Sequence, residues 1–269
     1  MIVNVEQKYR SQYDNVGESS VFEERKNSKM EKMMNLTNVQ EENSNDYTHF
    51  FEECAKHRSE CKFLNDLIDE ETQKKFNVGF CPTWVNTKAI RNGEKTIPRP
   101  KPKIIIPASS NSYFAINVGY VDVNSEEEVT YIANRKNSNE LFNMEILKVS
   151  TEPVFVVDDA VDVISFAAVG HNAVALADKD NCHSFVGYVK NNVPKYPLIF
   201  TTNKLYLSQF DVMNELDKLN IFFMDAHMGT AINYESFYEA LFDNKEGLKE
   251  EVEMYINGLK EYWDSINPN

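Results

Sequence analysis

Hydrophobic positions in the second half of the chain come in short runs, separated by longer amphipathic segments. The runs have the length of buried strands and lie at 154–157, 173–176, 198–200 and 221–224. The segments between them have helix-like spacing and lie at 160–169, 183–190 and 209–219. Short apolar strands that alternate with helices are typical of a parallel sheet covered by helices on both faces. The pattern therefore predicts an α/β domain at 151–232, followed by C-terminal helices at 233–269.

The first half of the chain has a different pattern. Residues 1–46 are rich in Asn, Glu, Ser and Lys, and we expect a flexible polar arm there. Residues 47–76 carry one apolar face at helical spacing. Apolar runs at 104–106 and 113–116 then predict two strands joined by a turn. We expect a mixed α+β N-terminal subdomain at 47–150.

Composition indicates a globular protein. The chain has 269 residues, of which 42% are hydrophobic, enough for real cores. It has no apolar run near the roughly 20 residues that span a bilayer. Its first ten residues are polar, without the apolar segment of a secretory signal, and its four cysteines show no disulfide spacing. We expect a cytoplasmic protein that does not enter a membrane.

The charge balance bears on possible partners. A net charge of −14 argues against a protein that coats nucleic acid, because such proteins usually present a basic face. One basic stretch is an exception, and its members are Lys88, Arg91, Lys95, Arg99, Lys101 and Lys103. Three prolines in the same stretch favour an extended, solvated loop. The alternative is a patch that contacts the phosphates of a nucleic acid.

Candidate metal ligands follow one predicted strand but not another. Asp158 and Asp159 come directly after the strand at 154–157, and Asp162 lies one helical turn further on. The strand at 198–200 is followed by Thr201, Thr202 and Asn203, with no acid. Parallel sheets that use Mg²⁺ collect carboxylates at neighbouring strand ends, because this hard cation needs several oxygen ligands. The three aspartates could hold one weakly bound Mg²⁺, or they could cap the following helix.

These pieces, in this order, carry a family resemblance. The segment 157–162, followed by 172–176, resembles the TOPRIM domain of bacterial-type DNA primases in the version carried by phages and mobile elements. Segments at 76–80 and 104–113 resemble the N-terminal part of the same catalytic core, and 234–248 resembles its closing helices. The resemblance covers residues 47–265 and depends on the order of several weak motifs.

The departures from the family pattern bear on activity. After the first strand the family has a glutamate and a glycine, where this chain has Asp158 and Asp159, while Asp162 matches the next acid. The family's Asp-x-Asp motif falls on Asn203 and Leu205, with Lys204 between them. In the family these acids would hold the divalent metals of nucleotidyl transfer. The motif is therefore degenerate at Asn203 and Leu205, and no catalytic residue is assigned beyond the residual candidates Asp158 and Asp162.

We therefore expect a primase-like protein of a phage or mobile element that has lost polymerisation and requires no cofactor. It would bind a protein partner to regulate replication or to inhibit a host defence system. Two alternatives stay open: an accessory that binds single-stranded DNA during replication, and a residually active, metal-dependent primase. The acidic balance favours the first expectation.

Two further groups of residues favour structure over chemistry. Cys54, His57 and Cys61 contain elements of a zinc site but have no obvious fourth ligand, so core packing is the better interpretation. The last helix carries four glutamates that we expect on a solvated face: Glu246, Glu250, Glu251 and Glu253.

Overall fold

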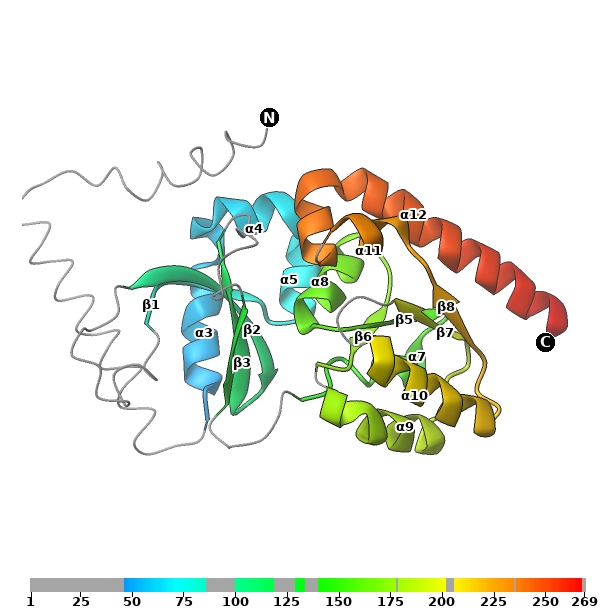
Figure 1. The fold of residues 1–269 in the computed structure, drawn as a ribbon. Helices are drawn as coiled ribbons and strands as arrows, with labels where there is room; N and C mark the ends of the chain where they lie inside the picture. The colour runs from blue at the N-terminus through cyan, green and yellow to red at the C-terminus, as the bar shows by residue number, and fades with distance from the viewer. Residues whose placement is uncertain are drawn as a thin grey trace, which may run out of the picture. The chain divides into compact units, whose positions relative to one another are not determined.

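The computed structural model describes most of the chain from residue 46 onward. The described ranges are 46–85, 100–118, 129–133, 140–177, 179–201, 206–234 and 236–267. The predicted arm therefore lies outside the described residues, except for Asp46. The chain divides into two compact units (Figure 1). The first comprises residues 1–66 and 73–135, and the second comprises 67–72 and 136–269.

The first unit is built on an antiparallel four-stranded sheet in the order β1-β2-β3-β4. Its strands are β1 (Gly79–Trp84), β2 (Lys101–Ser109), β3 (Ser112–Asn117) and β4 (Val129–Ala133). Strand β2 lies between β1 and β3, and its Ile105 pairs with Gly79 on one side and with Ala115 on the other. The predicted strands at 104–106 and 113–116 are confirmed as the centres of β2 and β3.

The segment predicted as one helical stretch is broken into short pieces. They are α3 (Thr48–Lys56), the 3₁₀ turn η1 (Arg58–Glu60), α4 (Lys62–Leu67) and α5 (Glu70–Lys75). The break before α5 has a local cause, because the Asp69 carboxylate accepts hydrogen bonds from the backbone and the hydroxyl of Thr72. A side chain that satisfies the first N–H groups of a helix starts a new helix at that point.

Helix α3 covers the sheet of the first unit through an aromatic core. Tyr113 of β3 lies against Tyr47 and Phe51, with ring centroids 5.0 Å and 5.9 Å away. Cys54 of α3 and Cys81 of β1 are buried in the same cluster. The apolar residues at 50–54 therefore form the buried face of α3, as their spacing predicts.

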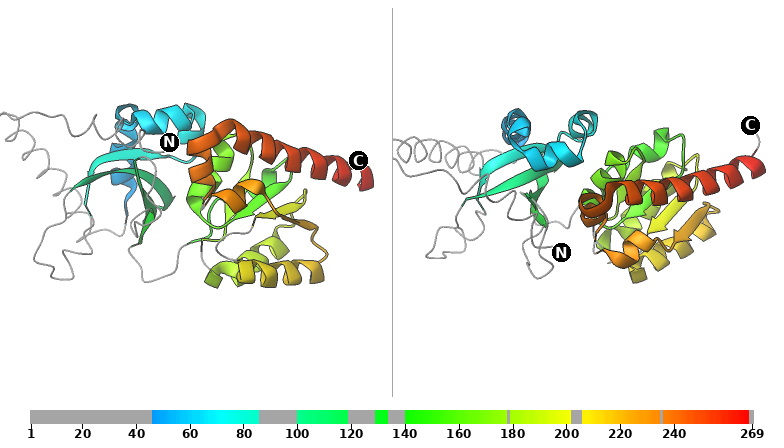
Figure 2. Two further views of the ribbon diagram at one scale, coloured as in Figure 1. Left: turned by 45° about the horizontal axis from the view of Figure 1, so that its top comes forward. Right: turned by 90° about the horizontal axis from the view of Figure 1, so that it is seen from above.

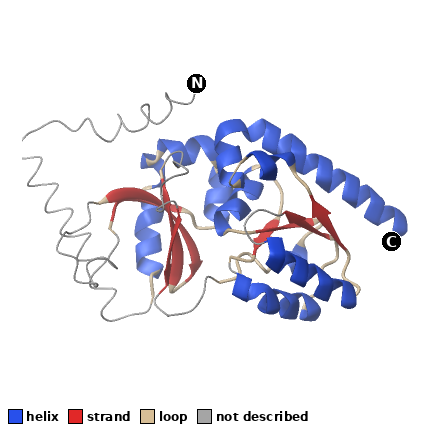
Figure 3. Cartoon of the chain, in the orientation of Figure 1, coloured by secondary structure: helices blue, strands red, loops and turns tan. Residues whose placement is uncertain are grey.

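The second unit contains a parallel four-stranded sheet in the order β6-β5-β7-β8. Its strands are β5 (Val154–Val157), β6 (Ala173–Ala175), β7 (Leu198–Thr201) and β8 (Phe223–Ala226). Helices cover both faces of the sheet (Figure 3). They are α7 (Ile146–Val149), α8 (Ala160–Ala168), α9 (Cys182–Asn191), α10 (Tyr206–Lys218), α11 (Gly229–Asn233) and α12 (Phe237–Ile266), with the 3₁₀ turn η2 (Lys179–Asn181) before α9. The predicted fold class, an α+β part followed by a parallel α/β sheet and C-terminal helices, is confirmed.

Side chains of β5 alternate between the two faces of this sheet. Val154 and Val156 pack in a core with Phe185 of α9 and Leu216 of α10. Phe155 points to the other face and meets Phe166 of α8, with ring centroids 4.4 Å apart. Because both faces are covered, the strand is apolar at every position, which is why its sequence shows no alternation.

Two predicted boundaries differ from the structure. Strand β8 begins at Phe223 and includes Asp225, whereas the apolar run predicted a strand at 221–224. Pairing with β7 sets these bounds, since Leu198 is opposite Phe223 and Thr201 is opposite Ala226. The short C-terminal helix α11 also lies earlier than expected, at Gly229–Asn233. The long helix α12 has 30 residues and a kink at Asn244, and Figure 2 shows it running along the outside of its unit.

Among the described residues, we find no helix that combines the length and the apolar character needed to cross a membrane.

Gly79 provides a test of the packing between α3 and β1. A Cβ added to Gly79 would lie 2.6 Å from Cβ of Cys54 and 2.8 Å from its carbonyl carbon, so α3 would have to move. We expect Gly79→Ala to reduce the free energy of unfolding by about 2 kcal/mol, measured by urea denaturation. Gly187 in α9 is the matched control, because a Cβ there meets no atom within 4 Å. Gly187→Ala should be neutral or stabilise by up to about 1 kcal/mol, and equal effects of the two substitutions would contradict the packing.

Candidate functional site at the carboxyl edge of the parallel sheet

The candidate metal ligands lie where β5 ends and α8 begins. Asp158 directly follows β5, is 6% exposed, and accepts a hydrogen bond from the Ala177 backbone at its own carbonyl. Asp159 has extended backbone angles and occupies the position that precedes the first turn of α8. Its side chain accepts no capping hydrogen bond, although a negative charge at a helix N-terminus is still favourable. The side-chain cap expected of Asp159 is therefore not formed in this structure.

Asp162 has a structural partner from a distant part of the chain. It lies in the first turn of α8, is 4% exposed, and its Oδ1 accepts a hydrogen bond of 2.8 Å from the backbone N–H of Phe237. Phe237 is the first residue of α12, and the first N–H groups of a helix have no partner within the helix. The Asp162 carboxylate thus binds the N-terminus of α12, where the helix dipole also favours a negative charge.

Aromatic contacts reinforce this attachment. Phe166 of α8 lies against Phe155 of β5 and against Phe237, with ring centroids 4.4 Å and 4.8 Å away. Ser236 provides a second cap for α12, because its hydroxyl accepts a hydrogen bond of 3.2 Å from the Glu239 backbone. One strand and two helices of the second unit are therefore joined around Asp162.

The neighbouring strand presents neutral chemistry at the same edge. Thr201, the last residue of β7, is 2% exposed and its hydroxyl donates to the Val156 carbonyl of β5 at 3.2 Å. The degenerate positions Asn203 and Leu205 lie outside the described residues. On β8, Oδ1 of Asp225 is buried and accepts no hydrogen bond from any residue that the structure describes. Acids at this edge therefore come from the β5–α8 junction and from β8, with threonine between them on β7.

Mg²⁺ is the cofactor that the family resemblance implies, and these residues do not fit it well. In the described part of the chain, no three His, Cys, Asp or Glu side chains are grouped so that they could hold a metal ion. One oxygen of Asp162 is already bound to the Phe237 N–H. Because Mg²⁺ requires near-octahedral oxygen ligands, this geometry does not favour the trio Asp158, Asp159 and Asp162 as its site. A weakly bound Mg²⁺ there stays a prediction.

Two residues of the basic stretch are described by the structure, and they differ in exposure. Lys101 is exposed at the start of β2, whereas Lys103 is 2% exposed and its Nζ donates to Oδ1 of Asn117 at 2.5 Å. The Lys103 ammonium also lies 5.4 Å from the centre of the Trp84 ring, a cation–π arrangement. Lys103 is therefore not on the surface where a phosphate would bind. The other four residues, Lys88, Arg91, Lys95 and Arg99, lie outside the described residues, and their role stays a prediction.

The zinc-like elements favour packing. Cys54 and Cys61 are buried, and His57 binds the Glu60 carboxylate through Nδ1 at 2.6 Å. Burial raises the pKa of Cys54 well above its ordinary value and raises the pKa of Cys61 to about 11. Burial thus favours the neutral thiol over the thiolate that zinc binds, which agrees with packing.

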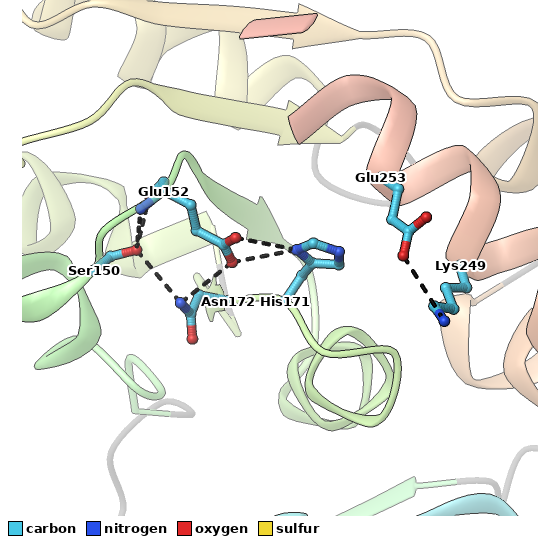
Figure 4. Close-up of polar contacts among 6 residues, drawn as sticks. All are labelled: Ser150, Glu152, His171, Asn172, Lys249 and Glu253. Carbon is cyan, nitrogen blue, oxygen red and sulfur yellow. Dashed lines mark hydrogen bonds and ion pairs between the residues drawn. The ribbon is translucent and has the colours of Figure 1, made fainter. Parts of the chain in front are cut away.

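The sequence did not predict two sets of polar contacts, one made by Glu251 and the other by a cluster around Glu152. Glu251, expected on a solvated face, caps α11 instead: its carboxylate accepts hydrogen bonds from the Gly229 and Thr230 backbones. At the amino edge of the sheet, His171 Nδ1 lies 3.3 Å from both Glu152 oxygens, and Asn172 reaches Glu152 and Ser150 at 3.4 Å (Figure 4). The Ser150 hydroxyl donates to the Glu152 carbonyl, so this cluster ties together the segments that lead into β5 and β6.

Asp162 generates a stability prediction. We expect Asp162→Ala to lower the free energy of unfolding by about 2 kcal/mol, because it leaves the buried Phe237 N–H without its charged acceptor. Asp162→Asn is the matched control, since its amide oxygen can still accept this hydrogen bond, and it should cost about 1 kcal/mol or less. Urea denaturation of the two variants measures the difference. Equal stability of Asp162→Ala and the wild type would show that the contact does not hold α12.

The two described lysines of β2 generate a second prediction. Lys103→Ala should lower the free energy of unfolding by about 2 kcal/mol, because Asn117 loses its donor and Trp84 its cation. Lys101→Ala, in the same strand but exposed, should change it by no more than about 0.5 kcal/mol. Thermal denaturation followed by circular dichroism compares them. The opposite order would place Lys103, and not Lys101, at the surface.

Comparisons with known proteins bear on the fold. No protein-family model matches the chain, and no curated protein sequence matches it. Among solved structures, the chain is similar to the DnaG catalytic core, with a TM-score of 0.50 and 13% identity over 77% of this chain and 76% of that one.

Two further structures are similar at lower scores. A DNA primase domain from Pseudomonas aeruginosa has a TM-score of 0.42 and 14% identity over 62% of this chain and 65% of that one. The Aquifex aeolicus primase, with its zinc-binding and RNA polymerase domains, has a TM-score of 0.47 and 13% identity over 77% of this chain and 59% of that one. The chain thus spans less than two thirds of either structure. On the similarity to the DnaG core, the fold is that of a primase catalytic core.

Proposed function

We propose that this chain is a primase-fold protein that does not polymerise nucleotides and that acts by binding a protein partner. The observation that carries the proposal is the hydrogen bond from the Phe237 N–H to Asp162. Asp162 is the acid that best matches the family's metal-binding pattern, and here it is buried and holds the N-terminus of α12. A fold does not by itself retain the chemistry of its relatives.

The chemistry of the neighbouring strand supports the same proposal. Nucleotidyl transfer needs divalent metals that neutralise the nucleotide phosphates, and these metals need carboxylates from adjacent strands. In this chain β7 ends in Thr201, whose hydroxyl is bound to the Val156 carbonyl. The described edge therefore lacks an adjacent pair of strands that both end in acids.

The net negative charge of the chain supports a protein partner over a nucleic acid. A net charge of −14 disfavours binding to a polyanion, whose affinity comes largely from basic residues that displace counterions. The resemblance to primases of phages and mobile elements suggests a partner in replication or in host defence. In the alternative, an accessory to single-stranded DNA, the described part of the basic stretch would contribute Lys101 but not the buried Lys103.

Primer synthesis tests the loss of polymerisation. We expect no extension products when the chain is incubated with single-stranded template, labelled ribonucleotides and either Mg²⁺ or Mn²⁺, because the described acids do not form a metal-binding group. A bacterial primase core under the same conditions is the positive control. Template-dependent product that disappears in Asp162→Asn would contradict the proposal, since that variant retains the cap on α12 but lacks the charge.

Binding of labelled single-stranded DNA separates the alternative. Fluorescence anisotropy at several salt concentrations should show no tight binding at low salt. Tight binding that weakens steeply with salt would favour the DNA accessory over the protein-binding function.

A further inference from the structure

The outer side of α12 carries a row of exposed residues at four-residue spacing. Met254, Tyr262 and Ile266 are 61%, 51% and 49% exposed, and Gly258 completes the row between the first two. We call these four residues the α12 ridge. Phe222, which precedes β8, extends the apolar surface, because its ring lies 5.9 Å from that of Tyr262. Residues four apart on a helix form the ridges that pack into grooves of a second helix.

Other exposed apolar side chains do not gather in this way. Val149, Val193, Phe210 and Ile232 are also more than half exposed, but they belong to four different segments of the chain. Single exposed apolar residues are normal on a protein surface, whereas a contiguous set marks a candidate interaction site. Among the described residues, the α12 ridge places three such side chains in one row of one helix, and the Tyr262 ring of this row contacts Phe222.

Gly258 adds a separate argument for a close approach by another helix. Glycine is a poor helix former, yet Gly258 lies within α12. A Cβ added there would meet no atom within 4 Å, so packing among the described residues does not require the glycine. Small residues in a ridge allow the backbone of a second helix to approach. Figures 1 and 2 both show this end of α12 extending past the sheet of its own unit.

The acidic residues beside the ridge indicate what kind of helix would bind there. Glu250 continues the row by one step, and Glu261 and Asp264 lie on the solvent side of it, all three exposed. Two lysines of α12 lie near the ridge: Lys249 pairs with Glu253 at 3.9 Å, and the Lys260 ammonium lies 5.9 Å from the centre of the Tyr196 ring. An apolar ridge flanked by acids complements an apolar stripe flanked by Lys or Arg. A second copy of this chain would bring acids against acids, and each copy carries a net charge of −14.

We propose that the α12 ridge and Phe222 bind a basic amphipathic helix of a partner protein, packed across Gly258. This inference rests on the proposed protein-binding function and names the class of its partner. The apolar stripe of the helix would cover Tyr262 and Ile266, and its cations would face Glu250, Glu261 and Asp264. The two helices would pack against each other, with the charged residues providing specificity and the apolar residues providing affinity.

Fluorescence anisotropy with two synthetic helices tests the proposal. One probe is a labelled amphipathic helix of Leu, Ala and Lys, and the other has Glu in place of each Lys. We expect the full chain to bind the Lys helix and not the Glu helix. Tyr262→Ser/Ile266→Ser should weaken that binding by at least about tenfold. The control, Val149→Ser/Ile232→Ser, removes two apolar residues that are even more exposed but lie outside the ridge, and it should leave the affinity unchanged.

Gly258→Leu is the second variant, because it fills the ridge without removing any contact of the folded chain. We expect its melting temperature to be equal to or above that of the wild type, and its affinity for the Lys helix to fall by at least about tenfold.

Equal affinity for both probes, or for the wild type and both ridge variants, would overturn the proposal. So would a dimer in analytical ultracentrifugation that is lost in Gly258→Leu, since the surface would then join two copies of the chain. Primer synthesis by the wild type would overturn the proposed loss of polymerisation without altering the outcome of these binding measurements.

Discussion

The hydrogen bond between Asp162 and the first N–H of α12 is the constraint on which the second unit depends. It joins α8 to the N-terminus of a 30-residue helix, where backbone donors have no partner within the helix. Phe166, between Phe155 and Phe237, adds apolar contact around the same point. Helix α12 in turn holds α11, because Glu251 caps it. The Asp162 carboxylate therefore fixes the N-terminus of α12, while buried residues further along the helix, among them Leu248, Val252 and Ile256, hold the part that carries the α12 ridge.

Under the proposed function, the same hydrogen bond would distinguish this chain from a metal-dependent polymerase of the same fold. A carboxylate that accepts a backbone N–H in a buried position has fewer lone pairs for a cation, and Mg²⁺ needs several oxygens in a fixed geometry. Thr201 adds no charge at the neighbouring strand end. Apolar residues hold the sheet and its helices, whereas the Asp162 carboxylate binds the N-terminus of α12. Fold and activity can diverge in this way because they depend on different residues.

The sequence predicted the parallel sheet well because both of its faces are covered, so that β5 and β7 appear as uninterrupted apolar runs. It did not predict the end of β8, because Asp225 is disfavoured in strands and is included there by pairing with β7. The partner of Asp162 had no sequence signal, since Phe237 lies 75 residues away and offers a backbone group. The predicted surroundings of Lys103 and Glu251 were wrong for a similar reason. A charged side chain suggests exposure, and only tertiary contacts show that Lys103 is buried and that Glu251 caps α11.

Whether Asp162 anchors α12 or binds a metal can be tested with a crystal structure of the chain soaked with Mn²⁺ and a nucleoside triphosphate, with anomalous scattering recorded to locate the metal. We expect no anomalous peak at the carboxyl edge of the parallel sheet, with Asp162 still within hydrogen-bonding distance of the Phe237 N–H. A Mn²⁺ ion coordinated by Asp158 and Asp162, with the N-terminus of α12 displaced from Asp162, would contradict it. The carboxylate would then be a metal ligand and not the anchor of the helix.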